Sequence, residues 1–145
     1  MKKIFFLISM LLIWSGCLGQ SNINFYYQDK TKATETDSIG YKFYIKNTSI
    51  ELQKKKDEVV LFFNNAAFID DLIKVNGKSY NFDQYSCGYR HIKVPRIKKI
   101  EIASKKKGKM EFNLKKEIDY IIINGDFNNK WSVTFSEYFP VMECL

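Results

Sequence analysis

The sequence has a single histidine among its 145 residues, and it lacks the short glycine motifs that mark many enzymes. One imidazole excludes a metal site built mainly on histidines. The chain has no glycine-rich loop for a phosphate group and no Gly-x-Ser-x-Gly motif of the kind that marks serine hydrolases. We therefore expect a protein that is not an enzyme and that holds no metal and no cofactor. A hydrolase with an unfamiliar site is the alternative.

Long apolar runs are absent apart from residues 4–14, a run of eleven residues near the N-terminus. A helix of that length rises only about 16 Å, too little to cross a hydrocarbon core of about 30 Å. The run follows two lysines and precedes small residues, which is the pattern of a signal peptide. We expect residues 1–19 to be cleaved after Gly19, which would leave residues 20–145 as one exported domain, periplasmic or secreted.

A second processing route competes with this one. Residues 15–17 resemble the end of a bacterial lipobox, in which residues 1–16 are removed and Cys17 is lipidated. Trp14 departs from that motif, which usually has leucine there. On this route the protein would be an outer-membrane lipoprotein, and on neither route does the mature chain keep a transmembrane span.

Cysteine is scarce, with three residues in all, and both routes leave only Cys87 and Cys144 as thiols of the domain. In an oxidising compartment such a pair usually forms a disulfide, which we expect here. With His91, the same thiols could instead form a Cys-Cys-His zinc site or a Cys-His nucleophilic pair. A disulfide would exclude both because it uses both sulfur atoms.

What the sequence does contain is a series of short runs typical of β-strands. Residues 109–114 and 130–135 alternate between polar and apolar, as a strand with one buried face requires. Residues 59–63 and 120–123 are apolar throughout, which predicts strands covered on both faces. Gly108 supplies one of the turns between runs. We predict an all-β fold, a single-domain antiparallel β-sandwich of about seven to nine strands with a C-terminal meander.

Residues 65–82 allow two interpretations. Asn65 could cap a helix with an apolar face that ends at the Asn-Gly pair of 76–77. The same pair is also the strongest two-residue hairpin signal, and a turn there places Ile73 opposite Tyr80. We prefer the hairpin because its register agrees with the hydrophobic pattern.

The first third of the domain gives weaker signals. We expect a short strand at 23–27, an exposed polar loop at 28–40 and a strand at 41–45, where aromatic or aliphatic residues alternate. Further on, we expect a short strand at 91–94. Pro95 interrupts it in a way that suits a sheet edge or a bend.

Residues 108–114 followed by 120–123 carry a rhythm that resembles transthyretin-like and carboxypeptidase-regulatory-like β-sandwich modules. Those modules have a Gly-x-Phe-x-Phe-x-Leu run and then Tyr-x-Ile/Leu-x-Ile. The chain departs from them at 117–119, where they usually have a glycine-containing turn. The resemblance implies a sandwich of about seven to eight strands that acts as a structural or binding accessory, and it carries over no catalytic residue.

The chain is basic, with a formal net charge of +7, and its lysines cluster at 54–56, 105–109 and 115–116. If the meander is correct, several of these lysines lie at turns at one end of the sheet. One interpretation is a surface for an anionic partner such as acidic glycan or lipid headgroups. The other, which we prefer, is that they keep the protein soluble and guard the sheet ends. Nucleic acid is not an expected partner of an exported protein.

The segment from Tyr85 to His91 is the best candidate contact loop. Tyr85, Tyr89, Arg90 and His91 are residue types enriched in recognition loops, and the expected disulfide would hold the loop still. The alternative is that the tyrosines only cover the edge of the core. We predict an exported, bacterial, envelope-associated or secreted protein with a non-catalytic binding or structural role, whose partner is a protein or glycan of the cell envelope. A secreted inhibitor or a stress protein is the other non-enzymatic alternative.

Overall fold

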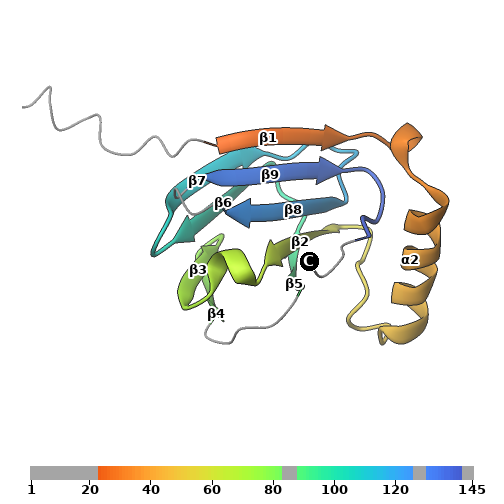
Figure 1. Cartoon of the computed structure of the whole chain (residues 1–145), viewed down its shortest axis with the longest axis horizontal. Coiled ribbons are helices and arrows are strands. Elements are labelled where there is room, and N and C mark those ends of the chain that lie inside the picture. Colours follow the sequence, from red (N-terminus) through yellow and green to blue (C-terminus); the bar gives the residue numbers. More distant parts are fainter. Residues whose placement is uncertain (1–22, 83–87, 126–129, 142–145) are drawn as a thin grey trace, which may run out of the picture.

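A computed structural model describes residues 23–82, 88–125 and 130–141, and in these residues two β-sheets pack face to face (Figure 1). The larger sheet contains, in spatial order, β1 (Ile23–Gln28), β9 (Trp131–Ser136), β8 (Tyr120–Gly125), β2 (Glu58–Asn64) and β5 (Tyr89–Pro95). The smaller sheet contains β4 (Lys78–Phe82), β3 (Asp71–Val75), β6 (Lys99–Ser104) and β7 (Gly108–Asn113). The described helices are α2 (Glu35–Asn47) and the 3-10 turns η2 (Lys30–Lys32) and η3 (Ala66–Phe68). The predicted all-β sandwich is confirmed.

The core lies between the two sheets and takes side chains from both. Alternate residues of the smaller sheet point inward, and they meet the buried side chains of β2, β8 and β9. Trp131 is fully buried, and its Nε1 donates a 3.2 Å hydrogen bond to the Lys107 carbonyl in the turn after β6. This bond joins the two sheets at one end, since β6 belongs to the smaller sheet and Trp131 to the larger.

The hairpin expected around residues 76–77 is present as β3 and β4. Ile73 pairs with Tyr80 and Asp71 with Phe82, which is the predicted register. Asn76 and Gly77 have φ of 48° and 81°, the left-handed conformations that a tight two-residue turn requires. The alternative helix is limited to the single 3-10 turn at Ala66–Phe68.

The predicted C-terminal meander is wrong. β6 and β7 form one hairpin and β8 and β9 another, but β7 and β8 lie in different sheets. The reason is the apolar run of β8, which needs cover on both faces. β8 lies in the larger sheet, between β9 and β2. One of its faces belongs to the core between the sheets, and on the other face Tyr120 packs against Phe139. The smaller sheet, by contrast, turns its outer face to solvent.

The chain crosses between the sheets at 114–119. Ile118 is fully buried, and Asp119 forms ion pairs with Arg96 and, at 2.9 Å, with Lys54. Arg96 also donates to the carbonyl oxygens of Lys116 at 2.9 Å and Ile118 at 2.7 Å. These contacts occupy the position where the resembled modules have a glycine-containing turn.

The sandwich was predicted to be antiparallel, but it contains two parallel pairs of strands. β1 pairs in parallel with β9, and β2 pairs in parallel with β8. Parallel partners need long connections, and both pairs have them: the strands β3 to β7 lie between β2 and β8 in the chain, and β1 and β9 are the first and the last of the described strands.

The strand expected at 41–45 is wrong, and so is the loop expected at 28–40 from residue 35 on, because residues 35–47 form α2. Thr34 starts the helix with a capping box, in which its hydroxyl accepts from the Asp37 N–H and the Asp37 carboxylate accepts from the Thr34 N–H. The apolar residues at 41, 43 and 45 alternate as in a strand, but in the helix they point in different directions.

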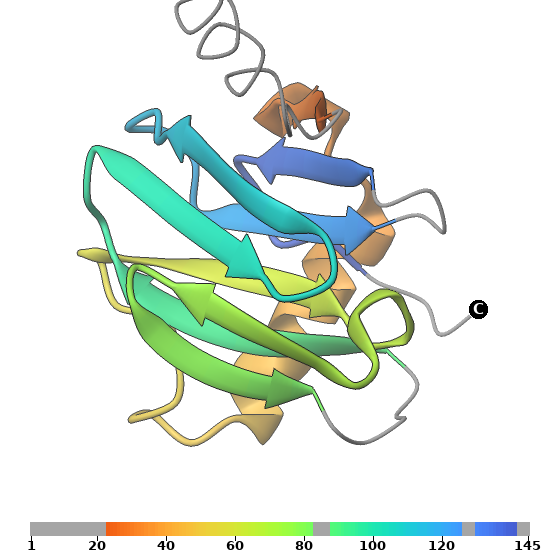
Figure 2. The same cartoon turned by 90° about the vertical axis from the view of Figure 1, so that its left-hand side faces the viewer.

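The helix covers the outer face of the larger sheet, as Figure 2 shows, where α2 lies behind that sheet and the smaller sheet faces the viewer. Tyr44 stacks on Phe139 with ring centroids 5.0 Å apart. Phe139 in turn packs edge-on against Phe62 and Tyr120, at 5.9 and 5.5 Å. Within the described residues, α2 is neither long nor apolar enough to cross a membrane, and no other helix is.

Candidate binding surface

The residues predicted as a contact site are only partly described. Tyr85 and Cys87 lie outside the described residues, as do Cys144 and Cys17, so the disulfide and the lipidation stay predictions. Tyr89, Arg90 and His91 begin β5, an edge strand of the larger sheet. Because successive side chains of a strand point to opposite faces of the sheet, Arg90 lies on one face and Tyr89 and His91 lie on the other.

Arg90 faces the inner side of the sandwich. Its guanidinium lies over the Phe82 ring at 5.0 Å and near the Tyr80 ring at 5.9 Å, and it donates to the Asn81 carbonyl. All three partners belong to β4, an edge of the smaller sheet. Arg90 therefore joins the two sheet edges, and its charge is partly used in packing.

Tyr89 and His91 face the opposite side, toward the aromatic layer under α2. The His91 ring meets Phe62 edge-on at 4.5 Å and lies 6.4 Å from Tyr44. Removal of the ring from water lowers the pKa of His91, although the residue keeps contact with solvent. None of the three depressions described below includes His91, and the described residues hold no cluster of three metal-ligating side chains.

The clustered lysines do not share one end of the sheet. Residues 105–107 precede β7, whereas 115–116 follow it. Several of these cations also have structural partners: Lys106 Nζ donates to the Ile69 carbonyl at 2.8 Å, and Lys107 Nζ lies 5.8 Å from the Phe68 ring centre. Lys107 also crosses Gly125 so closely that an added Cβ there would lie 2.5 Å from its side chain.

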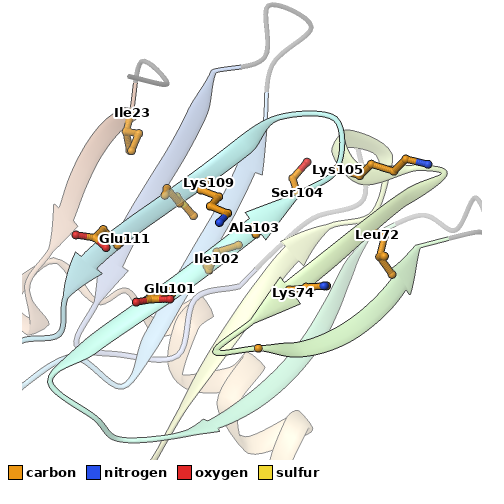
Figure 3. Close-up of a pocket in the computed structure, with 12 residues that line it drawn as sticks. Ile23, Leu72, Lys74, Glu101, Ile102, Ala103, Ser104, Lys105, Lys109 and Glu111 are labelled. Atoms are coloured by element: carbon orange, nitrogen blue, oxygen red, sulfur yellow. The ribbon is translucent and has the colours of Figure 1, made fainter. Parts of the chain in front are cut away.

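A broad groove of about 850 Å³ lies on the outer face of the smaller sheet (Figure 3). Its walls carry both signs of charge, with Lys74 and Lys109 on the same surface as Glu101 and Glu111. Lys99, beside the groove, pairs with Glu111 at 2.6 Å and with Glu101 at 3.9 Å. Mixed and paired charges on an open surface are typical of a solvated face rather than of a site selective for one ligand.

A second depression, of about 330 Å³, lies between α2 and the larger sheet. It is lined by Asp37, Asp119 and Glu137 together with tyrosine rings. Burial raises the pKa of Tyr120 strongly, so its hydroxyl stays protonated. Asp119 is paired with Lys54 and Arg96, and Asp37 caps the helix, so these carboxylates serve the fold.

The strand that stands out is β1, because its outer edge carries no charge. The described sheets have four edge strands, and three of them contain charged residues, namely Lys78 on β4, Arg90 and Lys93 on β5, and Lys109 and Glu111 on β7. Charged side chains and proline are the usual protection of an edge against pairing with another strand. β1 has neither, and it exposes Phe25, Tyr26 and Tyr27 by 50%, 55% and 41%.

The three aromatic residues of β1 line a cleft of about 290 Å³ between β1 and the end of β7. Phe25 stacks on Phe135 with ring centres 5.9 Å apart and an interplanar angle of 16°. The Phe112 ring meets both of these rings edge-on, with its centre 6.5 Å from that of Phe25 and 5.2 Å from that of Phe135. Lys115 Nζ lies 5.1 Å from the centre of the Tyr27 ring. The cleft is therefore walled by rings and has a cation at its rim.

Glu137 holds the far end of β1. Its Oε1 accepts from the Tyr27 hydroxyl, and its Oε2 accepts from the Lys30 N–H at 3.0 Å. The hydrogen bond to Glu137 raises the pKa of Tyr27 to about 12. We define the β1 edge as residues 23–28 together with this aromatic cleft.

This surface could be predicted from the sequence only in part. Residues 23–27 were expected to form a strand, and their aromatic, uncharged composition is visible in the sequence. That this strand lies at an edge beside β7 depends on pairing between residues more than a hundred positions apart. Comparison of the chain with protein-family models, with curated proteins and with solved structures finds no match.

Proposed function

We propose that the protein is an exported, envelope-associated binding protein without catalytic activity, and that it captures an extended protein segment at the β1 edge. Export is inferred from the leader pattern of residues 1–19. The binding role rests on one observation above all: β1 is the edge strand among the described four that carries exposed aromatic rings and no charge.

An unguarded edge strand suits binding by strand addition. Its outward backbone N–H and C=O groups offer hydrogen bonds to any extended segment, and side-chain pockets then select the sequence. The cleft between β1 and β7 is such a pocket, since the stacked residues Phe25 and Phe135 both line it. Lys115 at the rim would favour an acidic residue of the segment beside the aromatic contact.

The single substitution that tests this is Tyr26→Lys. A lysine in the middle of β1 copies the protection found on the other three edges, so we expect loss of the partner captured from envelope extracts. Tyr26 is 55% exposed, so the free energy of unfolding should change by less than about 1 kcal/mol.

Leu72→Lys is the matched control, because Leu72 is also exposed but lies on the outer face of the smaller sheet. Capture should survive this change. If Tyr26→Lys captures the partner as well as the native chain does, the β1 edge is not the site. If Tyr89→Ala removes capture instead, the site is the start of β5.

A further inference from the structure

Helix α2 is apolar on two opposite sides. Tyr41 and Tyr44 face the larger sheet and contact Phe139, at 5.8 and 5.0 Å between ring centres. Residues advance by about 100° along a helix, so Ile39 and Phe43 lie one turn apart on the opposite side. They are 59% and 69% exposed.

Two further exposed apolar residues follow the helix in the chain. Ile50, in the turn that follows α2, is 82% exposed, and Leu52 is exposed too. Single exposed apolar residues are normal on a protein surface, but four within fourteen residues of one helix and its turn mark an interaction site.

The cations around these residues are unused by the fold. The structure gives Lys42, Lys46, Lys55 and Lys56 no ion pair among the described residues, and all four are exposed. Lys54 between them behaves differently, since it pairs with Asp119 at 2.9 Å. The exposed apolar residues are therefore flanked by lysines that are free to meet anionic groups.

We propose that α2 and its turn dock on an anionic lipid surface. Ile39, Phe43, Ile50 and Leu52 would enter the boundary between headgroups and acyl chains, and the four lysines would contact lipid phosphates. A protein partner fits this surface less well, because lysine is depleted in protein interfaces while flexible ammonium groups suit headgroups. The proposal uses no residue of the β1 edge and does not depend on the proposed function.

The docked orientation follows from the fold. α2 covers the outer face of the larger sheet, so the smaller sheet lies on the far side of the sandwich from the helix (Figure 2). A membrane in contact with α2 would leave that sheet and its groove facing away from the lipid.

Vesicle flotation tests the proposal with the chain from Gln20, which contains every described strand and helix. We expect it to bind vesicles of equal parts phosphatidylglycerol and phosphatidylcholine, and to bind phosphatidylcholine alone at least about tenfold more weakly. The double variant Ile39→Ser, Phe43→Ser should lose about tenfold in binding. Leu72→Ser, which removes a similar exposed side chain elsewhere, should bind like the native chain.

Charge reversal separates the contribution of the lysines to vesicle binding from that of the apolar side chains. Lys42→Glu with Lys46→Glu should weaken binding to the anionic vesicles about tenfold. Lys74→Glu with Lys105→Glu makes the same change in net charge at the groove of the smaller sheet, and it should have a smaller effect. Equal losses in the two double variants would mean that only net charge matters, which would overturn the proposal.

The depth of Phe43 provides a direct readout. In a Phe43→Trp variant, brominated lipids should quench the fluorescence of the new tryptophan, because position 43 would lie in the bilayer. The native Trp131 should not be quenched, since it is fully buried in the protein. Leu72→Trp should not be quenched. Absence of quenching at 43, equal binding to both vesicle types, or a dimer in solution that the Ile39→Ser, Phe43→Ser variant dissociates would each overturn membrane docking.

Discussion

Asp71 is the residue on which the β6–β7 turn depends. It is 1% exposed, and its carboxylate accepts from the Ser104 hydroxyl and from the N–H groups of Lys105 and Lys106, at 3.0 and 3.3 Å. Ser104 Oγ in turn accepts from the Lys107 N–H at 2.7 Å. A buried carboxylate with this many donors organises the turn rather than a reaction.

We predict that Asp71→Ala lowers the free energy of unfolding by about 2 kcal/mol, because it removes three hydrogen bonds and leaves the buried Ser104 hydroxyl without its acceptor. The Lys105 and Lys106 N–H groups would keep their other acceptors, the Leu72 carbonyl at 3.2 Å and Ser104 Oγ at 3.1 Å. Urea denaturation measures the change. Asp57→Ala is the control, since Asp57 is exposed, and it should change stability by less than about 0.5 kcal/mol. Equal effects of the two substitutions would show that the carboxylate does not organise the turn.

His91 gives the protein a defined response to acid. Packing against Phe62 lowers its pKa in the folded state below the ordinary value of 6.5. As the pH falls through that range, the unfolded chain takes up a proton more readily than the folded one, so the contribution to stability is present above pH 6.5 and is lost on acidification.

The chain has one histidine, so its NMR titration can be followed without overlap. We expect a midpoint below that of the denatured chain. Removing the titrating group in His91→Gln should weaken the fall of stability with decreasing pH. A midpoint at or above that of the denatured chain would contradict the packing of the ring.

At the scale of elements, α2 is held by its cap and by the aromatic layer rather than by deep burial. None of its residues is fully buried, and the capping box of Thr34 and Asp37 supplies the hydrogen bonds of its first turn. Such a helix should open locally while the sandwich stays folded.

We therefore predict that Thr34→Ala destabilises α2 by about 1 kcal/mol. Hydrogen exchange should become faster in residues 35–47 and stay unchanged in β2 and β8. Thr36→Ala, an exposed change inside the helix, should not speed exchange. Faster exchange throughout the protein would mean that α2 and the sandwich unfold together.

The elements that could be predicted from sequence are those decided locally. The Asn-Gly pair at 76–77 and the alternation around it determine both the turn and the register of β3 and β4. α2 could not be found in the same way, because Tyr41, Phe43 and Ile45 have strand-like spacing while the helix signal at Thr34 is short. Its position depends on Phe139, about a hundred residues further on.

The crossing of the chain between the two sheets could not be predicted from the sequence either. Two successive strands with good turns favour a meander, but β8 is apolar at every position from 120 to 123 and must enter the sheet that α2 covers. Neighbours in sequence can thus belong to different sheets when one of them requires two buried faces. The candidate site shares this origin, since β1 meets β7 and β9 only in the folded chain.

At the scale of the whole molecule, the two sheets differ in what covers them. The larger sheet has α2 on its outer face, whereas the smaller sheet exposes mixed charges that pair with one another. Three of the four described edges carry charged residues, and the fourth, β1, presents aromatic rings beside an aromatic cleft. This distribution of charge over the sandwich is the reason why we propose binding at the β1 edge.

Site-specific photo-crosslinking in the living cell tests this account most directly. A photoreactive side chain at position 26 should give a light-dependent adduct with a second protein, whose crosslinked peptide is an extended segment. The same group at position 72 should give none. An adduct of equal yield at both positions, or none at position 26, would contradict binding at the β1 edge.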